Sequence, residues 1–158
     1  MVSTGRIVVA ALAVLVAGPT LAQDRLPAVT LPDSAAAQWT KAPADLPKGT
    51  MISLLMGDPS KPGPFVLRLI FPANTIIAPH THSKPETVTV LSGDIFHEHG
   101  ATLDKTKGEQ LHTGGFVYLP QDMPHSLWTT GAPVEVQVSG SGPFGLNYIN
   151  PKDDPSKS

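Results

Sequence analysis

Residues 79–93 read PHTHSKPETVTVLSG, and the rest of the chain is organised around this stretch. In an extended segment successive side chains point to opposite faces, so His80 and His82 share one face. A short turn containing Pro85 then lets Glu86 begin a second strand that faces the same interior. The spacing predicts two imidazoles and one carboxylate that converge inside a β structure.

This ligand set suits Mn, Fe, Co, Ni, Cu or Zn in the +2 state. The chain has no cysteine, so thiolate ligands are excluded and a fourth ligand must come from His, Glu, Asp or a carbonyl oxygen. His125, at the start of a strand-like run, is the candidate that the chain offers. We therefore predict one divalent transition metal, whose identity stays open, bound by His80, His82, Glu86 and His125.

The composition indicates one β-rich domain. The chain has 158 residues, of which 15% are charged and 6% aromatic, and it contains 14 glycines and 17 prolines. Such a profile is typical of short strands joined by many turns. Val, Ile, Leu and Phe recur in compact blocks between the turns, which indicates a folded chain with a core and not a disordered one.

The first 22 residues have the pattern of a cleaved secretory signal. Arg6 gives a positive start, residues 7–18 form an apolar run, and residues 20–22 (TLA) place small side chains at a cleavage site. The run is too short to span a bilayer comfortably, although an uncleaved N-terminal anchor stays as the alternative. We expect a mature protein that begins at Gln23, is periplasmic or secreted, and has no stable membrane anchor.

Loss of Arg6 with the signal would leave 10 basic and 13 acidic side chains, a formal net charge of −3. Because the chain has no basic block, nucleic acid and anionic membrane surfaces are poor candidate partners. A small molecule is the expected partner. A self-contained DNA-linked sensor is also excluded, because the sequence contains no helical DNA-binding domain.

Short alternating or β-branched runs predict about ten strands, without a long helix or an internal repeat. The division that we expect is a signal (1–22), an N-terminal arm (23–44), a β domain (45–150) and a polar tail (151–158). Within it, residues 57–65 are predicted to be a rigid turn and residues 100–110 a loop, whereas residues 34–39 are undecided between a helical turn and an edge segment. This pattern predicts an all-β, antiparallel sandwich or barrel.

The first ligand cluster resembles the first motif of the cupins, a family of small jelly-roll barrels with the pattern G-x5-H-x-H-x3,4-E-x6-G. His80, His82, Glu86 and Gly93 fit this pattern. Asn74 stands where the pattern has its leading Gly, a mild departure because Asn tolerates the left-handed backbone region better than most residues.

A second stretch resembles the second cupin motif, G-x5-P-x-G-x2-H-x3-N. Gly114, Pro120 and His125 match it, while Asp122 replaces the second Gly and Thr129 replaces the final Asn. The resemblance implies a single antiparallel cupin barrel that binds one divalent metal through the four residues named above. It does not imply one reaction, because the family includes dioxygenases, decarboxylases, isomerases, lyases, sugar-binding modules and storage proteins.

Other polar residues are expected to lie outside the metal site. His97 and His99 form a second H-x-H pair without a matching carboxylate, so we expect them to face solvent or to support the ligands from behind. His112 lies next to the hairpin residues 113–115 (TGG) and is expected to be exposed. Asp122 is expected to be a turn residue whose side chain caps local backbone.

The faces of the remaining strands follow from their alternation. Arg68 is predicted to lie on the outer face as a solvated residue, with a carboxylate-binding role in a cavity as the alternative. If the valines of residues 134–138 point inward, Gln137 points outward and cannot meet the metal. The same alternation puts Leu127 and Thr129 inward. The remaining residues of that strand, Ser126 and Trp128, would then point outward.

Four aromatic side chains on strands favour the core or a dimer interface over a ligand platform: Phe96, Tyr118, Phe144 and Tyr148. A homodimer in which residues 23–50 cross to a partner is a further hypothesis.

Two functions of different kinds fit the sequence. The first is a metal-dependent enzyme acting on a small and preferably anionic molecule, most readily an oxygen-using, dioxygenase-like oxidoreductase and otherwise a lyase or decarboxylase. The second is a non-enzymatic module that binds a small molecule or a metal. The ligand set favours the enzyme, because metal chemistry needs such a set. The lack of an evident general acid or base outside the ligands favours the binding module.

Overall fold

The computed structural model describes residues 26–157, so the predicted signal and cleavage site lie outside the described residues. The described chain consists of eleven strands and three short 3-10 helices. The strands are β1 (Thr40–Lys41), β2 (Met51–Met56), β3 (Gly63–Phe71), β4 (Ile76–His82), β5 (Glu86–Ser92), β6 (Ile95–His99), β7 (Glu109–Leu111), β8 (Phe116–Leu119), β9 (His125–Thr129), β10 (Val134–Gly142) and β11 (Leu146–Tyr148). The helices are η1 (Ser34–Ala36), η2 (Pro151–Asp153) and η3 (Pro155–Lys157).

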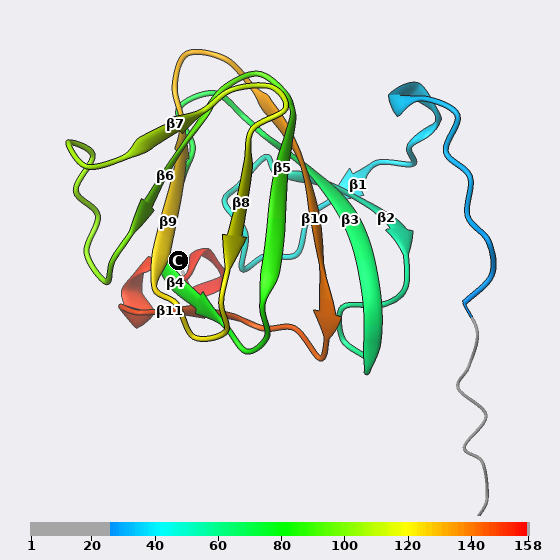
Figure 1. Ribbon diagram of the computed structural model, residues 1–158. Coiled ribbons are helices and arrows are strands. Elements are labelled where there is room, and N and C mark those ends of the chain that lie inside the picture. The colour runs from blue at the N-terminus through cyan, green and yellow to red at the C-terminus, as the bar shows by residue number, and fades with distance from the viewer. Residues whose placement is uncertain (1–25, 158) are drawn as a thin grey trace, which may run out of the picture.

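Two antiparallel sheets face each other and form the barrel (Figure 1). One has the order β1-β2-β3-β10-β5-β8 and the other the order β11-β4-β9-β6-β7. The predicted all-β, antiparallel jelly-roll architecture is therefore confirmed. Within the described part of the chain, no helix is long and apolar enough to cross a membrane.

The core lies between the sheets, where alternate residues of each strand point inward. On β3, Phe65, Leu67, Leu69 and Phe71 are buried, as predicted from their spacing. The same alternation buries Val134, Val136 and Val138 on β10, which pairs with β3 and β5. The centre of the larger sheet thus presents a continuous apolar face to the barrel interior.

Asn74 sits in the turn before β4 with φ at +57°, the left-handed conformation expected of the residue that replaces the motif glycine. Its backbone amide donates to the Thr130 carbonyl oxygen at 2.7 Å. Gly93, in the hairpin between β5 and β6, has φ at +79°, and a Cβ there would lie 2.8 Å from the Pro133 carbonyl oxygen. Both turns fix the ends of strands that carry predicted ligands.

Two local predictions were wrong. The turn predicted over residues 57–65 is shorter, because β3 already begins at Gly63. The loop predicted over residues 100–110 contains the start of β7, which pairs with β6 along the sheet edge. Trp128 points to the outer face of its sheet, as predicted, but it is buried there: Phe96 stacks on it at a ring distance of 5.4 Å, and Gly108 packs against its ring.

Arg68 lies on the outer face of β3 and not in the cavity, but it is not solvated. Its guanidinium lies 3.3 Å from the Glu135 carboxylate and donates to Gln137 at 3.3 Å and to the Ser34 hydroxyl at 2.9 Å. Only 14% of its side chain is exposed. The segment around η1 therefore covers part of the outer face of the larger sheet, which the strand pattern alone could not show.

Candidate metal centre

The two histidines of the first motif point into the barrel from β4, and His125 joins them from the neighbouring strand β9. His80 and His125 are direct cross-strand partners. The β4–β9 register shifts between Ile77 and His80, and this irregularity lets both of these residues face inward although they are three positions apart. Pro79 lies within it, a position where a missing N–H is tolerated.

The three imidazoles form a compact buried group. His80, His82 and His125 are 2%, 7% and 0% exposed, and one ring nitrogen from each lies within 4.8 Å of the others. Their geometry can hold a metal ion. The structure thus brings together the three histidines that the sequence selected.

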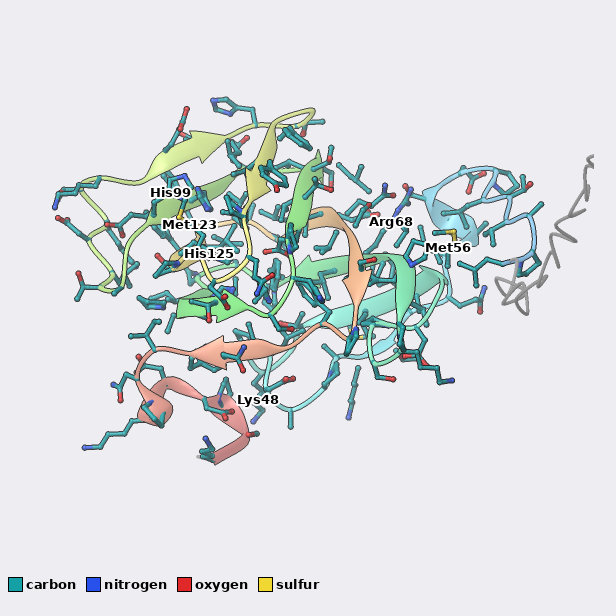
Figure 2. All side chains as sticks on the ribbon, turned by 60° about the horizontal axis from the view of Figure 1, so that its bottom comes forward. Lys48, Met56, Arg68, His99, Met123 and His125 are labelled. Atoms are coloured by element: carbon teal, nitrogen blue, oxygen red, sulfur yellow. The ribbon has the colours of Figure 1, made fainter. Side chains whose placement is uncertain are left out.

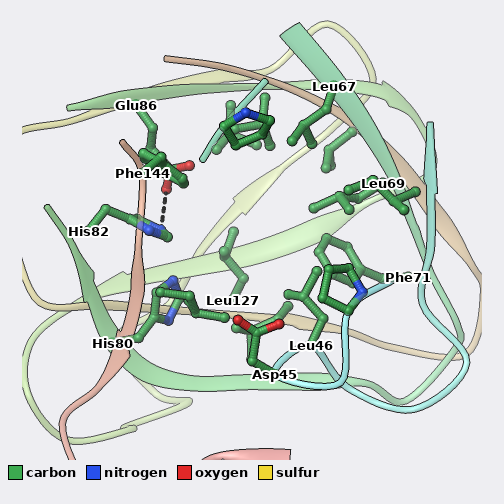
Figure 3. A pocket seen from close by; sticks show the side chains of 18 of the residues that line it. Asp45, Leu46, Leu67, Leu69, Phe71, His80, His82, Glu86, Leu127 and Phe144 are labelled. Carbon is green, nitrogen blue, oxygen red and sulfur yellow. Dashed lines mark ion pairs between the residues drawn. The ribbon is translucent and has the colours of Figure 1, made fainter. Parts of the chain in front are cut away.

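Glu86, the first residue of β5, approaches this group from the opposite sheet. Its Oε1 lies 3.0 Å from Nε2 of His82 and 3.3 Å from Nε2 of His125. The carboxylate is 5% exposed, and Figure 3 shows it across from His82 at the end of the ion-pair line. All four predicted site residues are therefore neighbours inside the barrel.

Each of the three rings is oriented by a backbone carbonyl at its Nδ1. His80 contacts the Ala78 oxygen at 2.8 Å, His82 the Gly145 oxygen at 2.7 Å, and His125 the Met123 oxygen at 3.0 Å. A carbonyl oxygen only accepts, so each Nδ1 carries the proton and donates it. In a neutral ring the Nε2 lone pair is then free to bind a metal.

In this tautomer the unprotonated ring nitrogens and the Glu86 carboxylate repel each other. In neutral rings, the lone pairs of His82 and His125 face a carboxylate oxygen at about 3 Å, where lone pair meets lone pair. Nε2 of His125 is buried without a hydrogen-bond partner among the described residues. A cation among these atoms, either a proton on a ring or a metal ion, removes the repulsion.

The acid–base state of the site follows from its burial. Burial lowers the pKa of His80 to about 3, and the adjacent His125 and His82 rings act in the same direction. For Glu86, burial acts to raise the pKa, but the contacts with His125 and His82 outweigh it and lower the pKa to about 2. At neutral pH the site therefore holds a neutral His80 and an ionised Glu86, the states in which both bind metals.

A cavity of about 180 Å³ adjoins the cluster, and its walls are mainly apolar (Figure 3). The polar side chains that line it are Asp45, His80, His82 and Glu86. Phe144 lines it as well and stacks on His82, with ring centroids 4.3 Å apart and an interplanar angle of 17°. The cavity can accept a small, largely apolar molecule beside the predicted ligands.

The other polar residues considered in the sequence analysis lie outside the group of predicted metal ligands. His97 is buried at 3% exposure and packs beside the cluster, with its ring centroid 5.8 Å from that of His125, whereas His99, labelled with His125 in Figure 2, is exposed. His112 is exposed as predicted and pairs with Asp94 at 2.9 Å. Gln137 points outward, as predicted, to Arg68.

Two motif departures have structural roles. Asp122, in place of a glycine, has φ at +59° and its backbone amide donates to the His82 carbonyl oxygen at 2.9 Å. Its side chain accepts from Gln121 at 3.1 Å, whereas the predicted side-chain cap of local backbone is not formed. Thr129, in place of the final Asn, donates to the Pro72 carbonyl oxygen at 2.6 Å and accepts from the Thr75 amide at 2.9 Å.

Sequence reasoning missed two contributors to the cavity. Phe144, assigned to the core or an interface, packs on the core and also lines the cavity. Asp45 was not singled out at all. A hint existed for Phe144, because it lies in the terminal region that closes the barrel beside β4, but nothing in the sequence marks Asp45. Tyr148, assigned likewise to the core or an interface, lies with its ring 6.0 Å from that of His80.

No protein-family model matches the chain, and no curated protein matches it. Solved structures do match. The polyketide cyclase RemF from Streptomyces resistomycificus has a TM-score of 0.67 at 16% identity, over 82% of this chain and 92% of that chain. The DMSP lyase DddQ from Ruegeria pomeroyi has a TM-score of 0.55 at 20% identity, over 73% of this chain and 64% of that chain.

A cupin 2 conserved barrel domain protein from Leptotrichia buccalis has a TM-score of 0.50 at 18% identity, over 61% of this chain and 43% of that chain. At these identities the likeness demonstrates a shared fold and no more.

Proposed function

We propose that this chain, a cupin by its fold, is a metal-dependent enzyme that acts on a small molecule in the barrel cavity. One divalent transition metal is bound by His80, His82, Glu86 and His125. The observation that carries the proposal is the convergence of imidazole nitrogens on one buried carboxylate, with each opposite ring nitrogen already bonded to a carbonyl oxygen. Only a cation stabilises such a set.

A bound divalent metal supplies a Lewis acid with open coordination positions, or a redox centre if it is Fe, Cu or Mn. Three neutral imidazoles, one carboxylate and a divalent ion carry a net charge of +1, which favours an anionic group on the ligand. The apolar cavity walls exclude water and thereby strengthen electrostatic contacts beside the metal cluster. The side chains that line the cavity orient the ligand. Phe144 stacks on the His82 ring and fixes the plane of that ring.

Oxygen-using, dioxygenase-like oxidation is the first reaction class that we propose, because a redox metal held by this donor set can drive the chemistry without a separate general acid or base. A lyase or decarboxylase is the second candidate. It is supported by the likeness in fold to a DMSP lyase. If neither reaction is found, the chain is a binding module without enzymatic activity.

Metal analysis of protein from its own host tests the proposal. We expect about one equivalent of a single transition metal, removed by chelator and restored on reconstitution. Iron or copper would support oxygen chemistry, whereas zinc would support the lyase or the binding module. Protein that holds less than about a tenth of an equivalent and cannot be reconstituted would overturn the metal centre and the enzyme together.

Export and assembly belong to the same proposal. A periplasmic or secreted protein should have a mature N-terminus near Gln23 by intact mass spectrometry, and a soluble cytoplasmic form that retains Met1 would contradict export. A homodimer should appear at twice the chain mass in light scattering at micromolar concentration, and a single-chain mass would contradict it.

A further inference from the structure

Asp45 brings a second charged group to the cavity, on the wall away from Glu86. It lies in the segment between β1 and β2 and lines the cavity together with His80, His82 and Glu86. Figure 3 shows Glu86 and Asp45 entering the cavity from opposite sides, with Leu46 beside Asp45. Two carboxylates thus line the cavity from different walls, Glu86 within the cluster and Asp45 outside it, and the other lining side chains besides the two histidines are apolar.

The backbone around Asp45 is held in place. The Leu46 amide donates to the Pro43 carbonyl oxygen at 3.1 Å, and the Leu46 side chain packs on the core. The Tyr148 hydroxyl donates to the Asp45 carbonyl oxygen at 2.7 Å. Burial, followed by the charge of Asp45, raises the pKa of Tyr148, so this hydroxyl stays a donor at every physiological pH.

The carboxylate itself has no partner that would explain its position. Among the described residues, Asp45 and Glu109 are the carboxylates without a hydrogen bond or ion pair, and Glu109 is exposed on the sheet edge. Asp45 is half-buried beside apolar side chains. The carboxylate is therefore available to pair with a cationic group in the cavity.

We propose that the cavity selects small zwitterions, with an anionic group toward the metal cluster and a cationic group paired with Asp45. This inference rests on the proposed metal centre, which gives the cluster end its positive charge. The metal cluster then carries a positive charge and Asp45 a negative one, and a ligand with the matching order of charges satisfies both. The apolar walls accept a short hydrocarbon spacer, and a cavity of about 180 Å³ limits its length.

The test uses ω-amino carboxylates on the protein loaded with Co²⁺. 4-Aminobutanoate, 5-aminopentanoate and 6-aminohexanoate are titrated by calorimetry against butanoate, pentanoate and hexanoate, and the visible spectrum of Co²⁺ reports the metal separately. A charge-assisted hydrogen bond predicts that the best amino carboxylate binds about tenfold or more tightly than the plain carboxylate of the same length.

Two variants of Asp45 assign the preference. Asp45→Asn should reduce the ratio of the two dissociation constants to about one and bind the plain carboxylate at least as tightly, because a repelling charge is gone. Asp45→Glu keeps the charge and should shift the preference to a shorter spacer. Asp94→Asn, at the surface pair with His112, is the matched control and should leave the ratio unchanged.

The outcomes separate the two proposals. Protein that fails to bind Co²⁺ overturns the metal centre, and the zwitterion site falls with it. Protein that binds Co²⁺ but shows no preference for amino carboxylates, or binds none of the six probes up to about 10 mM, overturns the zwitterion site alone. A preference that persists in folded Asp45→Asn protein with an unchanged Co²⁺ spectrum also overturns it.

Discussion

The chain contains two H-x-H pairs, on strands that flank the same third strand. His80 on β4 and His99 on β6 are both cross-strand partners of His125 on β9. Nevertheless, the rings of the first pair join His125 in a group that can hold a metal, and those of the second do not. The two pairs thus share their spacing and their pairing with β9, so these features do not explain why only the first pair joins a group that can hold a metal.

Two contacts separate the pairs. His80 and His82 each donate through Nδ1 to a carbonyl oxygen, whereas His97 makes no hydrogen bond among the described residues and its Nε2 is buried. Glu86 reaches His82 from across the barrel, whereas within residues 26–157 no carboxylate forms an ion pair with His97 or His99. A donor set therefore needs oriented rings and an opposing charge, and not the motif alone.

The largest expected effect comes from removing a ring of the first pair. His82→Ala should lower bound metal from about one equivalent to less than about a tenth and abolish the stabilisation by added metal, which is about 2.7 kcal/mol at a hundredfold excess over Kd. The measurements are elemental analysis and thermal unfolding with and without metal. His99→Ala is the matched change in the second pair and should keep both. Equal losses in the two variants would contradict the distinction.

Removing the opposing charge should have the next largest effect. Glu86→Gln preserves the shape and puts an amide donor beside the Nε2 lone pairs, so the metal-free protein should stay folded while metal affinity falls about tenfold to a hundredfold. Competition with a chelator of known affinity measures the change. Glu98→Gln, on β6, serves as control, because Glu98 accepts from the Asp104 amide and not from a ring. An unchanged metal affinity in Glu86→Gln would show that the three histidines bind the metal without Glu86.

Acid should destabilise the metal-free protein through one buried imidazole of each pair. The pKa is lowered to about 3 for His80, mainly by burial, and to about 4 for His97 for the same reason. Because the unfolded imidazoles titrate near 6.5, the unfolded state binds more protons below that pH, and stability falls as the pH decreases. Each imidazole contributes about 1.4 kcal/mol per pH unit below about 6.5.

Urea unfolding of chelator-treated protein between pH 7.5 and 4.5 measures this loss. His97→Gln should retain roughly half of the slope, since one of the two shifted imidazoles is gone. Stability that stays flat over this range in the parent protein would show that neither ring is buried in the neutral form.

The smallest effect is expected where the second pair is made apolar. His97→Leu removes a buried nitrogen without a partner and should stabilise the protein by about 1 kcal/mol without changing bound metal. Denaturant midpoints and metal content give the answer. His112→Ala, at an exposed surface pair, should change stability by less than about 0.5 kcal/mol. Loss of metal in His97→Leu would mean that His97 positions His125.

Much of the fold was predictable because its causes are local. Period-two alternation identified the inward face of β3 and of β10, and turn residues marked where strands end. The burial of Trp128 was not predictable in this way, because it depends on Phe96 and on the Gly108 loop covering the outer face of the sheet. Arg68 is a similar case, since Glu135 and Ser34 reach it from other segments.

By itself, the sequence determined which side chains can act as ligands and which strands carry them, because the two motifs fix spacing along neighbouring strands. Only the tertiary structure decided what surrounds them. It placed Glu86 within about 3 Å of two imidazoles, stacked Phe144 on His82, and turned Asp45 into the same cavity. Those contacts join segments far apart in the chain, and no local periodicity encodes the closure of one sheet over the other.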